Sequence, residues 1–150
     1  DERIELSIVT LAPDAYIAFM ASLDAYVFLS MGEGFSVTPR EAMALGLPVV
    51  LSNNTVHQTI CNSGLVYAVN TIKAIPAHYE VFNKAYGNFF MPDLQQASEY
   101  MQQIFEQRSS IYKVAEERRT WAAQYDISNM RETYIKNIKK ILQQGFYENS

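Results

Sequence analysis

Short apolar runs alternate with helical patterns through the first half of the chain. Runs rich in β-branched and aromatic residues are typical of buried strands. Four such runs occur, at Ile4–Val9, Tyr26–Ser30, Val49–Ser52 and Leu65–Val69. The segment Pro13–Leu23 has apolar residues along one helical face, and a short helix is expected at Thr55–Cys61. Strands that alternate with helices predict an α/β domain whose parallel sheet is flanked by helices.

The last third of the chain has apolar residues at helical spacing, which predicts three helices packed on the core. Their expected starts are Pro92–Asp93, Ser109 or Ser110, and Asp126 or Ser128. Their inward positions are expected to be Leu94, Ala97, Met101, Ile104 and Phe105, then Ile111, Val114, Ala115, Ala122 and Tyr125, and finally Met130, Tyr134, Ile138, Ile141 and Leu142.

The central stretch, Ser30–Ser52, predicts a strand, a loop, a helix and a second strand. Thr38, Pro39 and Glu41 have the spacing of a capping box with proline in the first turn. Gly46 is expected to end this helix, because glycine readily takes the left-handed conformation after a helical C-terminus. The whole stretch is therefore predicted to be a βαβ crossover.

A glycine-rich loop joins the first strand of this crossover to its helix. Gly32 and Gly34 surround Glu33, where the backbone is able to take a positive φ or to lie close to a ligand. The N-terminus of the following helix favours an anion, and Ser36 adds a hydroxyl. Carboxylates such as Glu33 and Glu41 accept hydrogen bonds from hydroxyls. This combination suits a nucleotide linked to a sugar.

Residues 33–50 resemble the donor-site signature of retaining glycosyltransferases of the GT-B fold, family 4. Glu33 and Glu41 meet its E-x7-E pattern, and Glu-Ala-Met-Ala, Gly and Pro-Val-Val follow. The resemblance implies that Glu33 is catalytic and contacts the transferred sugar, while Glu41 contacts the ribose and loop amides contact the phosphates. The donor-binding residues that it implies are Glu33, Gly34, Phe35, Ser36, Val37, Thr38 and Glu41.

Two departures from the signature and two simpler interpretations accompany this resemblance. Ser36 replaces the commoner glycine, and Arg40 stands at a usually apolar position, where it could face solvent or the phosphates. Glu41 could serve only to complete the capping box, and Glu33 could be a solvated loop residue.

The fold that the resemblance implies is a Rossmann-like parallel sheet flanked by helices, the C-terminal half of a GT-B fold, with a helical C-terminal tail. Residues 1–150 would form a single domain, a fragment of a longer enzyme that lacks the first two strands of its sheet and its N-terminal domain. Unpaired sheet edges favour contacts between chains. We expect this chain alone to be inactive.

The implied reaction moves a sugar from a nucleotide-sugar to a hydroxyl of a sugar or glycan acceptor, with retention of anomeric configuration. The implied enzyme is a hexosyltransferase in polysaccharide or glycoconjugate biosynthesis. Two alternatives remain open: a non-catalytic nucleotide- or sugar-binding module on the same fold, and a GT-B relative such as a nucleotide-sugar epimerase. Fold analogy alone does not separate them.

The composition limits which binding partners and cofactors are expected. The net charge is −4, from 12 basic and 16 acidic residues, and without a basic stripe a nucleic-acid partner is not expected. The single cysteine, Cys61, has no internal disulfide partner, which favours a reducing, cytoplasmic location. Membrane-surface association of a full-length enzyme stays open. We expect no metal site and no cofactor besides the nucleotide-sugar, since two histidines and one cysteine make a poor ligand set.

Residues 71–86 have no clean period and contain Pro76 among many aromatic residues. Family 4 members usually have a shorter connection here, so we expect an irregular insertion. It would form either a lid over the core or a loop that faces the sugar donor or acceptor. Gly87–Met91 is expected to be a strand that pairs with Leu65–Val69.

Overall fold

The computed structural model describes residues 2–143; Asp1 and residues 144–150, and with them both ends of the predicted domain, lie outside the described part. The helices are α1 (Pro13–Ala21), α2 (Val37–Ala44), α3 (His57–Cys61), α4 (Leu94–Glu106), α5 (Ala115–Ala123) and α6 (Ile127–Gln143). The strands are β1 (Tyr26–Phe28), β2 (Val49–Ser52), β3 (Tyr67–Val69), β4 (Thr71–Tyr79) and β5 (Lys84–Pro92). Short 3-10 turns occur at Glu80–Phe82 and Ile111–Val114.

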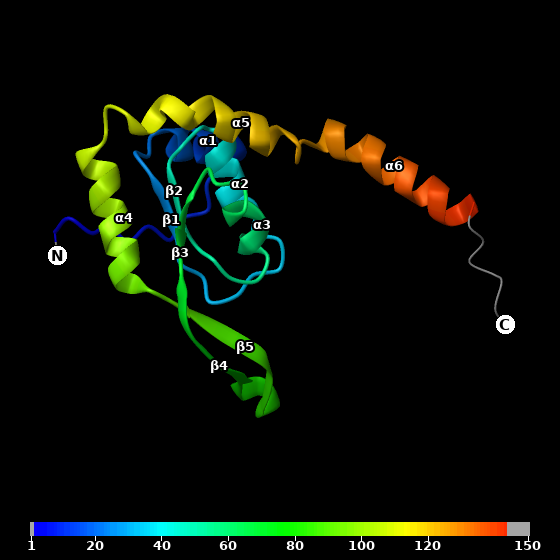
Figure 1. The fold of residues 1–150 in the computed structure, drawn as a ribbon, viewed down its shortest axis with the longest axis horizontal. Helices are drawn as coiled ribbons and strands as arrows, with labels where there is room; N and C mark the ends of the chain where they lie inside the picture. The colour runs from blue at the N-terminus through cyan, green and yellow to red at the C-terminus, as the bar shows by residue number, and fades with distance from the viewer. Residues whose placement is uncertain (1, 144–150) are drawn as a thin grey trace.

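The main sheet is parallel and has three strands in the order β1-β2-β3. Val27 pairs with Val50, and Leu51 pairs with Ala68. Helices lie on both sides of the sheet, with α4 on one side and α1, α2, α3 and α5 on the other (Figure 1). The predicted α/β fold with a parallel sheet flanked by helices is therefore confirmed.

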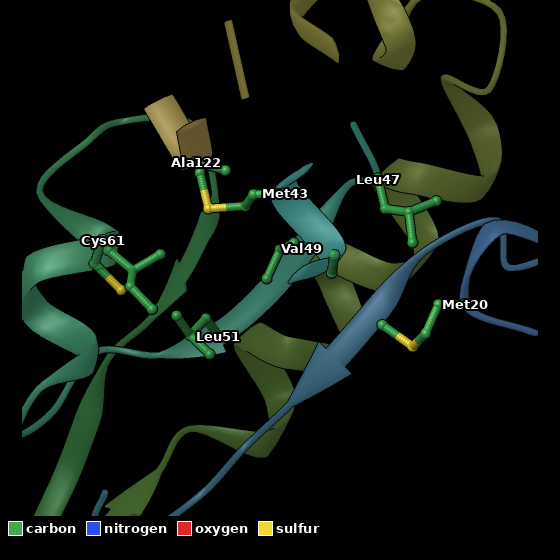
Figure 2. Packing of buried hydrophobic residues seen from close by; sticks show 9 residues of the cluster. Met20, Met43, Leu47, Val49, Leu51, Cys61 and Ala122 are labelled. Atoms are coloured by element: carbon green, nitrogen blue, oxygen red, sulfur yellow. The ribbon is translucent and has the colours of Figure 1, made fainter. Parts of the chain in front are cut away.

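The central strand β2 supplies side chains to two cores, one on each face of the sheet. Val49 and Leu51 pack among residues of α1, α2, α3 and α5, as Figure 2 shows for part of that cluster. Val50, between them, points to the opposite face and packs with Ala97 and Ile104 of α4. Successive side chains of a strand alternate between faces, so an entirely apolar strand must be covered on both sides.

The predicted first strand, Ile4–Val9, is not a strand in the structure. Its apolar side chains are open to solvent; Leu6 is 86% and Ile8 is 89% exposed. A strand needs a neighbour to accept and donate its backbone hydrogen bonds, and Ile4–Val9 has none among the described residues. One edge of β1 is likewise unpaired within the described residues. Contacts between chains through this edge stay a prediction.

The prediction that residues 71–86 are irregular is also wrong, while their being an insertion that faces the sugar donor or acceptor stays a prediction. Residues 71–79 form the long strand β4, which pairs with β5 in an antiparallel hairpin, from Thr71 opposite Pro92 to Tyr79 opposite Lys84. The predicted pairing of Gly87–Met91 with Leu65–Val69 is therefore replaced by pairing with β4. Proline has no N–H to donate to a neighbouring strand. Pro76 is tolerated because each strand of this two-stranded sheet has one edge without a neighbour. The hairpin extends away from the main sheet (Figure 1).

The predicted C-terminal helices form, but only part of their apolar surface is buried. The N-cap Asp93 accepts a hydrogen bond from the amide of Gln96 at 3.0 Å and so starts α4. Helix α6 has no buried residue, and it extends away from the body of the molecule (Figure 1). The prediction that its apolar stripe belongs to the core is wrong; Tyr134, for example, is 58% exposed. None of the described helices has the length and apolar character that a membrane crossing requires.

Gly46 ends α2 as predicted. It takes a φ of +81°, its amide donates to the carbonyl of Met43, and the amide of Leu47 donates to the carbonyl of Ala42. This pattern is a Schellman motif, in which the left-handed residue after the helix is usually glycine.

Gly46→Ala is expected to lower the free energy of unfolding by about 2 kcal/mol, because a Cβ adds both left-handed strain and a clash. That Cβ would lie 3.1 Å from Cβ of Ala115, which is fixed on α5, and 2.9 Å from Nη2 of Arg119, whose flexible end is able to move aside. Urea unfolding measures the change. Gly64→Ala is the matched control, because Gly64 has a φ of +71° with nothing within 4 Å of an added Cβ. Equal losses in the two variants would contradict the packing part of this prediction.

Candidate functional site

The predicted glycine-rich loop, residues 29–36, joins β1 to α2 at the carboxyl edge of the parallel sheet. Open α/β sheets bind their ligands at this edge. Gly34 is exposed, and a Cβ placed there would meet nothing within 4 Å, so its backbone is accessible. Gly32 and Gly34 do not have the positive φ that their sequence allowed; Ser36 has it instead, at 60°.

The neighbouring loop after β2 supports this glycine-rich loop through hydrogen bonds. The Ser52 hydroxyl and the Asn54 side chain both donate to the carbonyl of Ser30, at 2.6 and 2.9 Å. The amide of Glu33 donates to the hydroxyl of Thr55 at 3.0 Å. Glu33 is half-buried, and its carboxylate has no hydrogen bond or ion pair with the described residues. Its backbone is thus held while its carboxylate stays available to a ligand.

The predicted capping box does not form. Helix α2 begins at Val37, its N-cap residue is Ser36, and no side chain caps it. Thr38 instead accepts a hydrogen bond from the hydroxyl of Tyr26 at 2.7 Å. Glu41 accepts one from the hydroxyl of Tyr16 at 2.8 Å. The interpretation that Glu41 serves only to complete a capping box is therefore wrong.

An uncapped N-terminus leaves the first amides of α2 without partners inside the helix. Val37 and Thr38 supply such amides, and Pro39, next in the chain, has none to satisfy. Val37 is 53% exposed and Phe35 is 46% exposed, so the start of α2 is open to solvent. The helix dipole adds a partial positive charge there. This helix end is thus able to bind an anion.

Glu41 lies between two hollows of the surface. One, of about 410 Å³, is mainly apolar and is bordered by residues of α1 that include Tyr16 and Ile17. The other, of about 620 Å³, brings Glu41 together with Phe35 and Val37, but not with the remaining predicted site residues Glu33, Gly34, Ser36 and Thr38. Burial, followed by the hydrogen bond to Glu41, raises the pKa of Tyr16 to about 12. Tyr16 therefore stays a hydrogen-bond donor to this carboxylate at neutral pH.

Arg40 does not face solvent, contrary to one of the two expectations for it; the other, that it faces the phosphates, stays a prediction. It is only 6% exposed, and its guanidinium lies between the rings of Phe35 and Tyr125, 4.2 and 4.5 Å from their centroids. It donates to the carbonyl of Phe35 and, at 2.8 Å, to that of Ser36. In a trans peptide the N–H points opposite to the C=O. The amides of Ser36 and Val37 are therefore directed away from Arg40.

His57 is a buried residue of the site that the motif analysis did not include. Its Nε2 lies 2.6 Å from the hydroxyl of Ser36, and its Nδ1 lies 3.1 Å from the carbonyl of Ser52. A carbonyl only accepts, so Nδ1 carries the proton and Nε2 accepts from Ser36. The sequence signal was a histidine just after a buried strand, but nothing local connects it to Ser36, which lies 21 positions away.

Burial lowers the pKa of His57. The unfolded chain therefore takes up a proton, near pH 6.5, that the folded chain resists. We expect stability to fall as the pH drops below about 6.5, by at most about 1.4 kcal/mol per pH unit from this group. NMR titration of the imidazole and urea unfolding between pH 7.5 and 5.5 measure both effects. A His57 ring that titrates at or above pH 6.5 would contradict this expectation.

Together, the parallel sheet, the accessible loop at its carboxyl edge and the uncapped helix define an α/β domain with a candidate ligand site at that edge. The family Glycosyl transferases group 1 matches residues 8–122, so this chain belongs to the group 1 glycosyl transferases. It is also similar to O-antigen chain mannosyltransferase B of Escherichia coli, with 38% identity over 68 residues. That alignment covers 44% of this chain and 18% of the relative, less than a fifth of the relative's length.

Among the described residues, no three His, Cys, Asp or Glu side chains gather into a group that could hold a metal ion. Cys61 is buried, and burial raises the pKa of its thiol to about 11, which makes it a poor ligand or nucleophile at neutral pH.

Proposed function

We propose that this chain is the donor-binding domain of a retaining, family 4 hexosyltransferase that uses a nucleotide-sugar. The observation that carries the proposal is the accessible loop that leads into the uncapped N-terminus of α2, beside a carboxylate held by Tyr16. In this proposal the diphosphate binds the first amides of α2, Glu41 accepts hydrogen bonds from the ribose hydroxyls, and Glu33 contacts the transferred sugar. Group 1 membership supports the transfer of a sugar from a nucleotide-sugar, and the residue roles are our assignment.

The chemistry follows from where charge develops during the transfer. Cleavage of the bond between sugar and diphosphate leaves negative charge on the leaving phosphate, which oriented amides and a helix dipole stabilise. Arg40 donates hydrogen bonds to the carbonyls of Phe35 and Ser36, and these bonds fix the orientation of the amides of Ser36 and Val37. Glu33 would stabilise positive charge that develops on the sugar, and would orient its hydroxyls. No cofactor besides the nucleotide-sugar enters this proposal.

The acceptor and the complete activity belong to the longer enzyme that we propose. The aligned relative is a mannosyltransferase of O-antigen chains, which supports polysaccharide assembly as the setting and a hexose as the sugar. In this proposal an N-terminal domain of the longer enzyme supplies the acceptor site; the alignment over only 18% of the relative's length supports a longer enzyme.

Calorimetric titration of this chain with UDP, GDP, ADP and CDP tests the proposed donor site. We expect one of them to bind, and Glu41→Ala to weaken its binding at least tenfold, about 1.4 kcal/mol, through loss of the ribose contact. Glu99→Ala is the control, because Glu99 is an exposed carboxylate on α4 that pairs with Gln95. Unchanged affinity in Glu41→Ala would overturn the ribose assignment. No binding of any of the four would overturn a donor site carried by this chain alone.

A further inference from the structure

Ser36 has a backbone conformation that usually requires glycine. Its φ is 60° and its ψ is 76°, in the left-handed region, where a residue with a Cβ is strained by about 1–2 kcal/mol. It stands at the turn from the glycine-rich loop into α2. It is also buried, with 8% of its surface exposed, so the surrounding structure must hold it in place.

His57 supplies that hold from a neighbouring segment. Its side chain is fully buried, and its Nδ1–H is directed at the carbonyl of Ser52, which leaves Nε2 as the acceptor for Ser36. The hydroxyl of Ser52, which also lies 3.2 Å from Nδ1, donates to the carbonyl of Ser30. A chain of hydrogen bonds thus runs from Ser30, just after β1, through Ser52 and His57 to Ser36, and the bonds of His57 are buried.

Ser36 is held on two sides at once. His57 binds its hydroxyl, and Arg40 binds its carbonyl, from the other end of the same residue. These two contacts fix the peptide group between Ser36 and Val37, and with it the direction of the Val37 amide. With only one of the two contacts, Ser36 would be free to rotate about that contact.

We infer that His57 is a positioning residue of the sugar-donor site: it holds Ser36 in the left-handed conformation that aims the loop amides at the donor diphosphate. This inference rests on the proposed function. It makes a specific prediction about the variant Ser36→Gly. Glycine takes the left-handed conformation without strain, so a loop with glycine in place of Ser36 no longer needs the hydrogen bond to His57.

The test is a double-mutant cycle with His57→Asn and Ser36→Gly. Asparagine places its amide N–H near the position of Nδ1, so it keeps the bond to Ser52 and loses the one to Ser36. We expect His57→Asn to weaken binding of the nucleotide that binds the wild type, among UDP, GDP, ADP and CDP, about five- to tenfold when Ser36 is present. In the Ser36→Gly background the same substitution should change affinity less than about twofold. His78→Asn, on the exposed hairpin, is the control.

A purely structural role for His57 gives a different result. His57→Asn would then lower the unfolding temperature and change nucleotide affinity by the same factor in both backgrounds, which would overturn the inference. A nucleotide-free measurement separates this outcome from failure of the proposed function. In ¹H–¹⁵N spectra, His57→Asn should shift the amide signals of residues 35–38, and Ser36→Gly should abolish that further shift. If the amide signals of residues 35–38 do not move in His57→Asn, the inference is overturned even if nucleotides bind. If the wild type binds no nucleotide, only the proposed function is overturned.

Discussion

Glu33→Gln is expected to reduce sugar transfer by the enzyme that contains this chain by about 10²–10³-fold, the loss that typically follows removal of one preorganised electrostatic contact. Glutamine keeps the size of the side chain and removes its charge. The backbone of Glu33 is fixed by Thr55, and its carboxylate has no partner among the described residues. The substitution should therefore leave the loop in place and act on the reacting sugar.

Initial rates with the nucleotide-sugar and a hydroxyl acceptor measure this loss, and NMR of the product gives its anomeric configuration. A Glu33 that acts mainly in the transition state, as we propose, predicts that KM for the sugar donor changes less than about threefold while kcat falls. Glu80→Gln, in the exposed turn of the hairpin, is the matched control. An unchanged rate in Glu33→Gln would favour the non-catalytic interpretation of the module, and a product with inverted configuration would contradict retention.

Features governed by neighbouring residues were predicted correctly from the sequence. The apolar run Val49–Ser52 is the fully buried central strand, and Gly46 ends α2 in a left-handed turn. Both have a local signal in the sequence. A continuous apolar run indicates a strand that is covered on both faces, and a glycine after a helical segment indicates its end. The position of the glycine-rich loop follows from these two elements, and so does the position of the candidate site.

Features governed by distant partners were not predicted. Thr38 and Glu41 have the spacing of a capping box, but Tyr26 and Tyr16 bind them instead. The hydroxyl of Tyr16, 25 positions before Glu41, binds the Glu41 carboxylate in place of the N-cap amide. Rules based on neighbouring residues do not take such a distant hydroxyl into account. The same holds for the hydrogen bond between His57 and Ser36. Propensity and spacing describe what a segment prefers by itself, and tertiary contacts decide among those preferences.

Strands likewise depend on the presence of a partner. Residues 71–79 become a strand because residues 84–92 can fold back on them, despite the proline in their middle. Ile4–Val9 has a better strand composition and remains unpaired in the described chain. Backbone hydrogen bonds to a neighbour, rather than side-chain preference, decide between the two cases.

Arg118 is expected to be among the costliest side chains to remove. Only 2% of it is exposed, and it donates to three carbonyls, those of Leu65, Gly46 and Ile111. These carbonyls lie just before β3, just after α2 and at the start of the 3-10 turn that precedes α5. Burial lowers the pKa of Arg118, yet the guanidinium stays charged at neutral pH. One side chain thus joins three segments that are far apart in sequence.

Arg118→Met is expected to lower the free energy of unfolding by about 3–4 kcal/mol, because buried carbonyls left without a donor cost about 1–3 kcal/mol each. Methionine fills much of the volume of the arginine, so the loss reports hydrogen bonds more than a cavity. Urea unfolding gives the value. Arg119→Met is the matched control: Arg119 is its neighbour on α5, its side chain is 49% exposed, and it bonds the carbonyl of Leu45 and the carboxylate of Glu116. We expect that control to cost less than about 1 kcal/mol, since exposed pairs contribute little. Equal losses of unfolding free energy in the two variants would contradict this prediction. They would mean that water satisfies the carbonyls around Arg118, and that packing of α5 against α2 alone holds the end of α2.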